Sequence, residues 1–180
     1  LGDPRAITVI ETMVRAGVQE RDMYEETAIT ALGYIGDPSA LPVLADATTN
    51  RNFYVPFHAM FAMSAIGDER AAAFMRPMLT NRNDRLEISA VCSLALLGQQ
   101  DTLPQLAKIL DSETEWERFA ALLGLIALDS PEARQILQAH REKESSALRT
   151  AFDHAAAGEK TLAIVEMLKR IGHVKELNDF

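Results

Sequence analysis

A short motif that ends one helix and begins the next recurs at nearly constant spacing along the chain. Gly36-Asp37-Pro38 is followed by Gly67-Asp68 and then by Gly98, so the three glycines are evenly spaced in the sequence. One more step of the same length leads to Asp129, and Gly2-Asp3-Pro4 repeats the motif a slightly longer step before Gly36. A regular period of this kind is typical of helical repeats, in which each unit buries its apolar face against its neighbours.

The motif has the chemistry of a boundary between two helices. Glycine relieves backbone strain at a helix C-terminus, aspartate caps the N–H groups of the next helix, and proline is tolerated at the first helical position. The segment that follows, such as residues 38–47, spaces its apolar residues by three and four, which indicates a helix and not a strand. A polar turn then leads to a second helix, for which Asp84 and Thr114 are predicted caps in two units.

Each second helix ends in a stretch of Ala, Leu and Gly, as in residues 28–35, and such small residues let neighbouring repeats approach closely. We predict an all-α fold, an α-α superhelix (solenoid) of about five helix-hairpin repeats within one domain, residues 1–180. The expected repeats are about residues 2–35, 36–66, 67–97, 98–128 and 129–157, with 158–180 as a capping helix and tail. Because Leu1-Gly2 matches the end of a preceding helix, we expect a fragment of a longer array.

Residues 32–44, Leu-Gly-Tyr-Ile-Gly-Asp-Pro-Ser-Ala-Leu-Pro-Val-Leu, resemble the HEAT-like repeat of the phycobilisome-lyase type. The resemblance covers residues 1–137, and Asp129 departs from it by standing where glycine is expected. It implies an armadillo-type fold of the kind found in bacterial scaffold proteins. It also implies that first helices line the convex face and second helices the concave face.

The second helix of the second repeat carries several aromatic residues and no formal charge. Its expected outward positions are Phe53, Tyr54, Phe57, Phe61 and Ala65. Its expected core positions are Val55, Ala59, Ala62, Met63 and Ile66. A surface helix normally keeps a polar stripe, so this aromatic face is either covered by the flanking repeats or an exposed contact patch.

Neighbouring second helices extend the expected concave face. The preceding helix contributes Asp22, Met23, Glu26, Thr30 and Tyr34, and the following one contributes Arg85, Ile88, Cys92 and Leu96. Trp116 begins the next second helix, as either a packing residue at the repeat junction or a binding anchor. The predicted partner-binding residues are Tyr54, Phe57, Phe61, Arg85, Ile88 and Trp116. A helix or extended peptide with apolar anchors and some basic residues fits this face, and self-association through it is also consistent.

No constellation of residues predicts a catalytic, cofactor-binding or metal-binding site. The four histidines, at positions 58, 140, 154 and 173, are isolated, and none belongs to a His-Glu-x-x-His frame. His58, on the aromatic helix, is expected to be a hydrogen-bonded packing residue. The iron-dependent deoxyhypusine hydroxylases, which are built on similar repeats, use consecutive His-Glu pairs. Here the residues after the histidines are Ala59, Arg141, Ala155 and Val174, so a non-catalytic protein is expected.

Charge and cysteine content narrow the remaining classes of function. A net charge of −8 argues against nucleic acid as a partner, because phosphates repel an acidic face. The single cysteine, Cys92, excludes an internal disulfide and a cysteine-based zinc site, and its apolar setting predicts a buried, inert thiol. A cytoplasmic location is the default for such a chain. No apolar run is long enough to span a membrane.

These observations favour a protein–protein interaction scaffold that presents its second helices to a partner. A bilin-lyase-like or cofactor-chaperone subunit is an alternative that follows only from the family resemblance. A purely structural spacer within a larger protein is the third possibility.

Overall fold

The computed structural model describes residues 5–17, 24–50, 54–80, 84–144, 146–160 and 163, and it is all-α across them. The predicted fold class, all-α with helix-hairpin repeats, is confirmed. The chain divides into two compact units, Leu1–Leu97 and Gly98–Phe180. The first unit contains α1 (Arg5–Gly17), α2 (Tyr24–Ile35), α3 (Leu41–Ala47), α4 (Tyr54–Ile66), α5 (Ala71–Met75) and α6 (Asp84–Leu96). The second contains α7 (Leu103–Ile109), α8 (Glu115–Leu128), α9 (Pro131–His140) and α10 (Ser146–Ala156). Short 3-10 helices occupy Pro38–Ala40, Arg76–Thr80, Gln100–Thr102 and Arg141–Lys143.

The residue that ends each of four second helices adopts the same unusual backbone conformation. Gly36, Gly67 and Gly98 have φ angles of 75°, 74° and 78°, in the left-handed region that glycine enters without steric cost. Asp129 has a φ of 48° at the end of α8, so an aspartate fills the position that glycine fills elsewhere. Four consecutive helix ends therefore share one conformation at one constant interval in the sequence.

Two aspartates of the motif accept hydrogen bonds from backbone N–H groups: Asp37 caps the 3-10 helix before α3, and Asp68 accepts its bond just before α5. Asp37 Oδ1 accepts a hydrogen bond from Ser39 N at 2.8 Å, and Asp68 Oδ1 accepts one from Arg70 N at 2.9 Å. The predicted cap at Thr114 is wrong: this residue precedes α8, but its side chain makes no capping hydrogen bond. The side chain of Asp84 and the motif at residues 2–4 lie outside the described residues.

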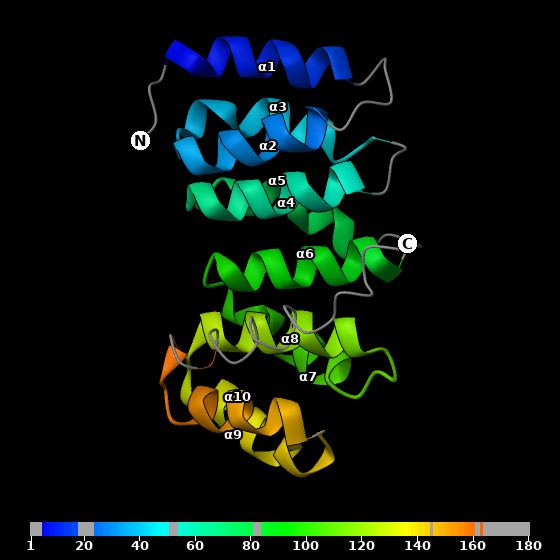
Figure 1. Cartoon of the computed structure of the whole chain (residues 1–180), viewed down its shortest axis with the longest axis vertical. Coiled ribbons are helices and arrows are strands. Elements are labelled where there is room, and N and C mark those ends of the chain that lie inside the picture. Colours follow the sequence, from blue (N-terminus) through cyan, green and yellow to red (C-terminus); the bar gives the residue numbers. More distant parts are fainter. Residues whose placement is uncertain are drawn as a thin grey trace. The chain divides into compact units, whose positions relative to one another are not determined.

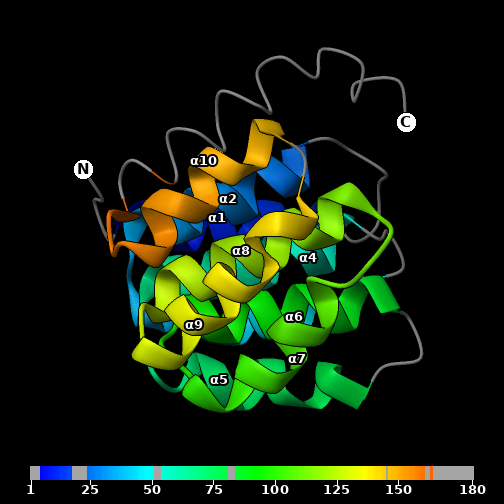
Figure 2. The ribbon, with the colours of Figure 1, turned by 90° about the horizontal axis from the view of Figure 1, so that it is seen from below.

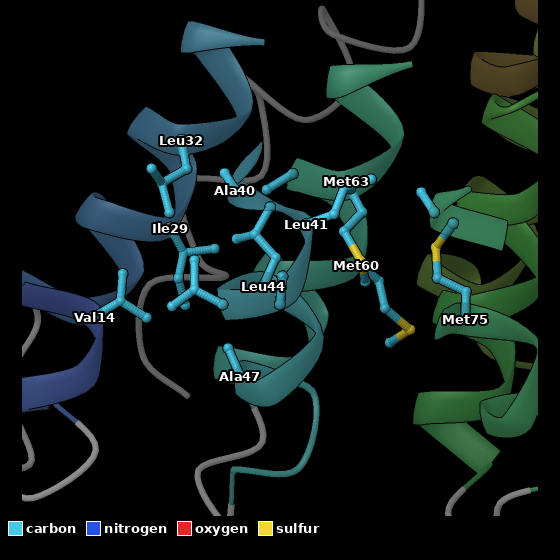
Figure 3. Packing of buried hydrophobic residues seen from close by; sticks show 14 of the residues in the cluster. Val14, Ile29, Leu32, Ala40, Leu41, Leu44, Ala47, Met60, Met63 and Met75 are labelled. Carbon is cyan, nitrogen blue, oxygen red and sulfur yellow. The ribbon is translucent and has the colours of Figure 1, made fainter. Parts of the chain in front are cut away.

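The second helices of the first unit stack in chain order. α2 packs against α4, α4 packs against α6, and α3 lies against α4 (Figure 1). Their interface is filled by large, fully buried side chains from three successive helices (Figure 3), which are Ile29, Leu32, Leu44, Met60 and Met63. Burial of so much apolar surface is the main force that holds the stack together.

The core positions predicted for α4 agree with its packing. Val55, Ala59 and Met63 are fully buried, Ala62 is 5% exposed, and Ile66 packs partly buried against the same core. The absence of charge in this helix follows from its position between α2 and α6, because a charged side chain on either flank would be desolvated.

The second unit follows the same hairpin pattern. α7 packs against α8, α8 against α9, and α9 against α10 (Figure 2). Leu122 and Leu125 of α8 are fully buried, as are Leu137 of α9 and Phe152 of α10. The expected capping helix and tail at residues 158–180 lie mostly outside the described residues.

Candidate partner-binding surface

An open depression of about 460 Å³ lies between the second helices of the first and second repeats. It is named here the α2–α4 groove, and its lining residues are Glu26, Thr27, Thr30, Ala31, Tyr34 and His58. His58 is the contribution of α4, and the other lining residues belong to α2. The groove therefore lies on the helices that the sequence predicts for the concave face.

Helical spacing explains why α2 supplies most of the lining. Glu26, Thr30 and Tyr34 are four residues apart, and residues at this interval lie one above the other on a helix face. Tyr34 is 83% exposed, although a tyrosine ring has a large apolar surface. Asp22 and Met23, which the sequence places on the same stripe, lie outside the described residues.

Glu26 and Thr30 place hydrogen-bond acceptors in the groove. The Thr30 hydroxyl donates a 2.8 Å hydrogen bond to the backbone carbonyl of Glu26, so its own oxygen contributes an acceptor. The Glu26 carboxylate lies 3.7 Å from Nε2 of His58, and each side chain is about one-third exposed, at 33% and 34%. The Glu26 carboxylate is the one ionisable acid of the lining, whereas the hydroxyls of Thr27 and Tyr34 and the His58 imidazole can also donate hydrogen bonds.

Three aromatic side chains of α4 lie along the outward face of this helix, and together they are named the aromatic ridge: Tyr54, Phe57 and Phe61. Tyr54 is 49% exposed, and the two phenylalanines are partly exposed. The Phe57 and Phe61 ring centroids are 4.7 Å apart, and Phe57 also contacts the His58 ring edge-on at 5.5 Å. The ridge is therefore partly covered by packing and partly open at the surface. Phe53 lies outside the described residues.

The remaining predicted partner-binding residues are in different environments. Arg85 is exposed at the start of α6, whereas Ile88 on the same helix is only 8% exposed. The burial of Ile88 corrects the expectation that it points outward. Trp116 belongs to α8 in the second unit, where it is partly exposed.

Sequence reasoning missed the part of α4 that completes the groove. His58 was expected to be a hydrogen-bonded packing residue, yet it is partly exposed and faces Glu26. Thr27 and Ala31 are one position beyond the predicted stripe of α2. A groove forms where the faces of neighbouring helices meet, so it is lined both by a stripe and by the residues next to that stripe. Helical spacing in the sequence could have identified Thr27 and Ala31 for this reason.

Burial shifts the pKa values of two ionisable groups in the first unit, Glu25 and Cys92. Glu25, next to Glu26 but turned inward, is 4% exposed, and its burial raises the pKa of its carboxyl group. Asn50 Nδ2 donates a 3.0 Å hydrogen bond to Glu25 Oε1 and partly offsets that effect. Burial raises the pKa of the Cys92 thiol to about 12, which agrees with the expected buried thiol. Its full burial corrects the expectation that Cys92 contributes to the concave face.

In the part of the chain that the structure describes, no group of three His, Cys, Asp or Glu side chains has the arrangement of a metal site. Outside the α2–α4 groove, His140 Nδ1 lies 3.0 Å from the Ile136 carbonyl and its Nε2 lies 3.3 Å from Asp111, and His154 Nδ1 lies 2.6 Å from Glu159. Over the same described residues, no helix combines the length and apolarity needed to cross a bilayer.

Comparison with known proteins identifies the type of repeat in the first unit. Residues 19–95 match the family model for HEAT repeats, a stretch that includes α2, α4 and almost all of α6. No curated protein matches the chain in sequence. Among solved structures, human deoxyhypusine hydroxylase in complex with glycerol is similar at 20% identity and a TM-score of 0.39, over 93% of this chain and 75% of that one. Residues 19–95 therefore consist of HEAT repeats.

Proposed function

We propose that the protein is a non-catalytic scaffold that binds a peptide or protein partner on the face formed by its second helices. The observation that carries this proposal is the α2–α4 groove beside the aromatic ridge, with Tyr34 83% and Tyr54 49% exposed. HEAT repeats generally mediate protein interactions, so the family supports the class of function.

The chemistry of the two features favours a peptide with apolar anchors and some basic residues. Aromatic side chains supply a large contact area at low conformational cost, which is why they dominate binding energy at interfaces. The partly exposed Phe57 and Phe61 offer such area beside the acceptors of the groove. The net charge of −8 steers basic ligands toward the protein and acts against nucleic acid.

Arg85 extends the proposed surface along α6, while Ile88 supports it from beneath as a mostly buried side chain. Trp116 is kept in the proposal as a partly exposed aromatic residue of the second unit. Self-association through the aromatic ridge would use the same side chains, so the oligomeric state must be measured alongside peptide binding.

A peptide selected from a displayed random library, labelled with a fluorophore, gives a direct test by anisotropy. Phe57→Ala and Phe61→Ala should each weaken its affinity about tenfold or more, while the helical circular-dichroism signal is retained. Tyr54→Ser is a second probe, because a side chain that is 49% exposed tolerates replacement.

Phe74→Ala is the matched control, since Phe74 is a similarly exposed aromatic residue (38%) on α5, the first helix of its repeat. Selected peptides that bind all three ridge variants with unchanged affinity, or that lose affinity only for Phe74→Ala, would contradict the proposal. A sedimentation experiment on the unliganded chain separates self-association from peptide binding.

A further inference from the structure

We propose that the α2–α4 groove binds an arginine side chain of the partner, between the Glu26 carboxylate and the Tyr34 ring. This inference rests on the proposed function, because it assigns one anchor of the peptide to one place on the binding surface. Its basis is the inventory of groups that line the groove and the distances between them.

The first argument is that Glu26 and Thr30 offer hydrogen-bond acceptors at one end of the groove. Glu26 is the one acidic side chain among the lining residues, and its carboxylate offers two oxygens. The Thr30 hydroxyl hydrogen is used on the Glu26 carbonyl, which leaves the Thr30 oxygen as an acceptor. A guanidinium group has five N–H donors and no acceptor, so it complements this set of groups.

The second argument is the capacity of the Glu26 carboxylate. The His58 ring faces it across the groove, and the 3.7 Å between Nε2 and Oε2 exceeds the ~2.7–2.9 Å of a charge-assisted hydrogen bond. A bidentate guanidinium would form two short bonds where the protein forms one long contact. The side chain of Glu26 is 33% exposed, so such a ligand reaches it from solvent.

The third argument is the shape of the other end of the groove. Tyr34 lies eight residues from Glu26, about 12 Å along the helix axis, so its 83% exposed ring meets the apolar stem and backbone of an arginine whose guanidinium is at Glu26. Ala31 lies between Glu26 and Tyr34 along α2 and gives an apolar surface for the methylene stem. The volume of about 460 Å³ accommodates one such side chain with its neighbouring backbone.

The test uses the full chain, ¹⁵N-labelled, and two small probes, N-acetyl-arginine methylamide and its uncharged citrulline analogue. We expect the arginine probe to shift the backbone resonances of residues 26–34 and of His58 in a saturable manner, with little response to citrulline. Glu26→Gln should weaken this binding about three- to fivefold, and Tyr34→Ala, which removes apolar contact with the arginine stem, about twofold or more.

Glu132→Gln is the matched control, because Glu132 is also an exposed glutamate in the first turn of its helix, α9, but lies outside the groove. Equal shifts from arginine and citrulline, shifts that avoid the groove, or unchanged binding by Glu26→Gln would each overturn the inference. The proposed function is overturned by a different result, namely peptide affinity that does not change when the residues of the aromatic ridge are replaced. If the arginine probe does not bind, but selected peptides still lose affinity when Phe57 or Phe61 is replaced, only this inference is overturned.

Discussion

The hydroxyl of Ser64 donates a 2.8 Å hydrogen bond to the backbone carbonyl of Ser93, across the contact between α4 and α6. The equivalent pair one repeat earlier is Gly33 and Ala62, since both positions shift by the interval that separates Gly36 from Gly67. A Cβ atom on Gly33 would lie 2.9 Å from Ala62 Cα, closer than carbon atoms approach without repulsion. The two contacts therefore occupy equivalent positions in successive repeats. The glycine allows close approach of α2 and α4, and the buried hydrogen bond joins α4 and α6.

Gly33→Ala is expected to destabilise the first unit. The added methyl group meets the backbone of Ala62, which moves only if the whole of α4 shifts against α2. Overpacking of this kind costs about 1–3 kcal/mol, partly offset by the higher helix propensity of alanine. Urea unfolding followed by circular dichroism measures the loss, and an unchanged midpoint would show that the contact is looser than the structure indicates.

Ser64→Ala tests the equivalent contact between α4 and α6. The substitution removes a hydroxyl that lies 2.8 Å from the Ser93 carbonyl and 3.0 Å from the Met60 carbonyl, but the Ser93 carbonyl keeps a second partner, the backbone N–H of Leu97 at 3.2 Å. No acceptor is left unpaired, so we expect a loss of only about 1 kcal/mol in the free energy of unfolding. A loss several times larger would mean that the hydroxyl has a role beyond this bond.

Asp129→Gly and Asp129→Ala isolate the cost of the left-handed backbone at the end of α8. Both variants lose the ion pairs of Asp129 with Arg134 (2.7 Å) and Lys160 (3.2 Å), so their difference reports the backbone alone. Because φ is 48° at this position, the alanine variant should be less stable than the glycine variant by about 1–2 kcal/mol. Equal stability of the two in urea unfolding would contradict the assignment.

Glu25→Gln addresses the pH dependence that burial of Glu25 produces. Burial raises the pKa of this carboxyl group above its ordinary value of 4.5, so the folded chain holds the proton to a higher pH than the unfolded chain does. Stability contributed by the protonated form is present below the unfolded pKa and is lost as the pH rises through the folded pKa. The glutamine variant lacks this step, so its unfolding midpoint should fall less than that of the native chain between pH 4 and pH 7, two buffer values chosen to bracket the titration. An identical pH profile for the two proteins would show that Glu25 contributes nothing to it.

The repeat could be predicted from the sequence because the left-handed helix end demands glycine or a tolerant residue. Gly36, Gly67 and Gly98 mark these ends in the letters themselves, and Asp129 was found at the same spacing although its residue type differs. The core of α4 was predictable for a similar reason, since apolar residues at helical spacing define one buried face.

The candidate surface was less predictable because exposure depends on what the neighbouring elements cover. Ile88 has the same helical phase as outward residues, yet α6 packs against the 3-10 helix Arg76–Thr80 as well as against α4 and is mostly covered. The break from α5 into that 3-10 helix comes just before Pro77 and has no counterpart in the second repeat. Likewise Thr114 has the residue type of a cap, but its side chain makes no capping bond. In the turn before α8, Ser112 Oγ instead accepts a 3.0 Å hydrogen bond from the backbone N–H of Thr114.

Site-specific photo-crosslinking of a library-selected peptide tests the central claim, that the second helices α2 and α4 present the binding face. A photoreactive phenylalanine analogue is placed in turn at Tyr34, Tyr54 and Phe74, all exposed positions that tolerate a new aromatic side chain. We predict crosslinks to the peptide from positions 34 and 54 and none from position 74. Crosslinking from Phe74 alone, or equally from all three, would contradict the account.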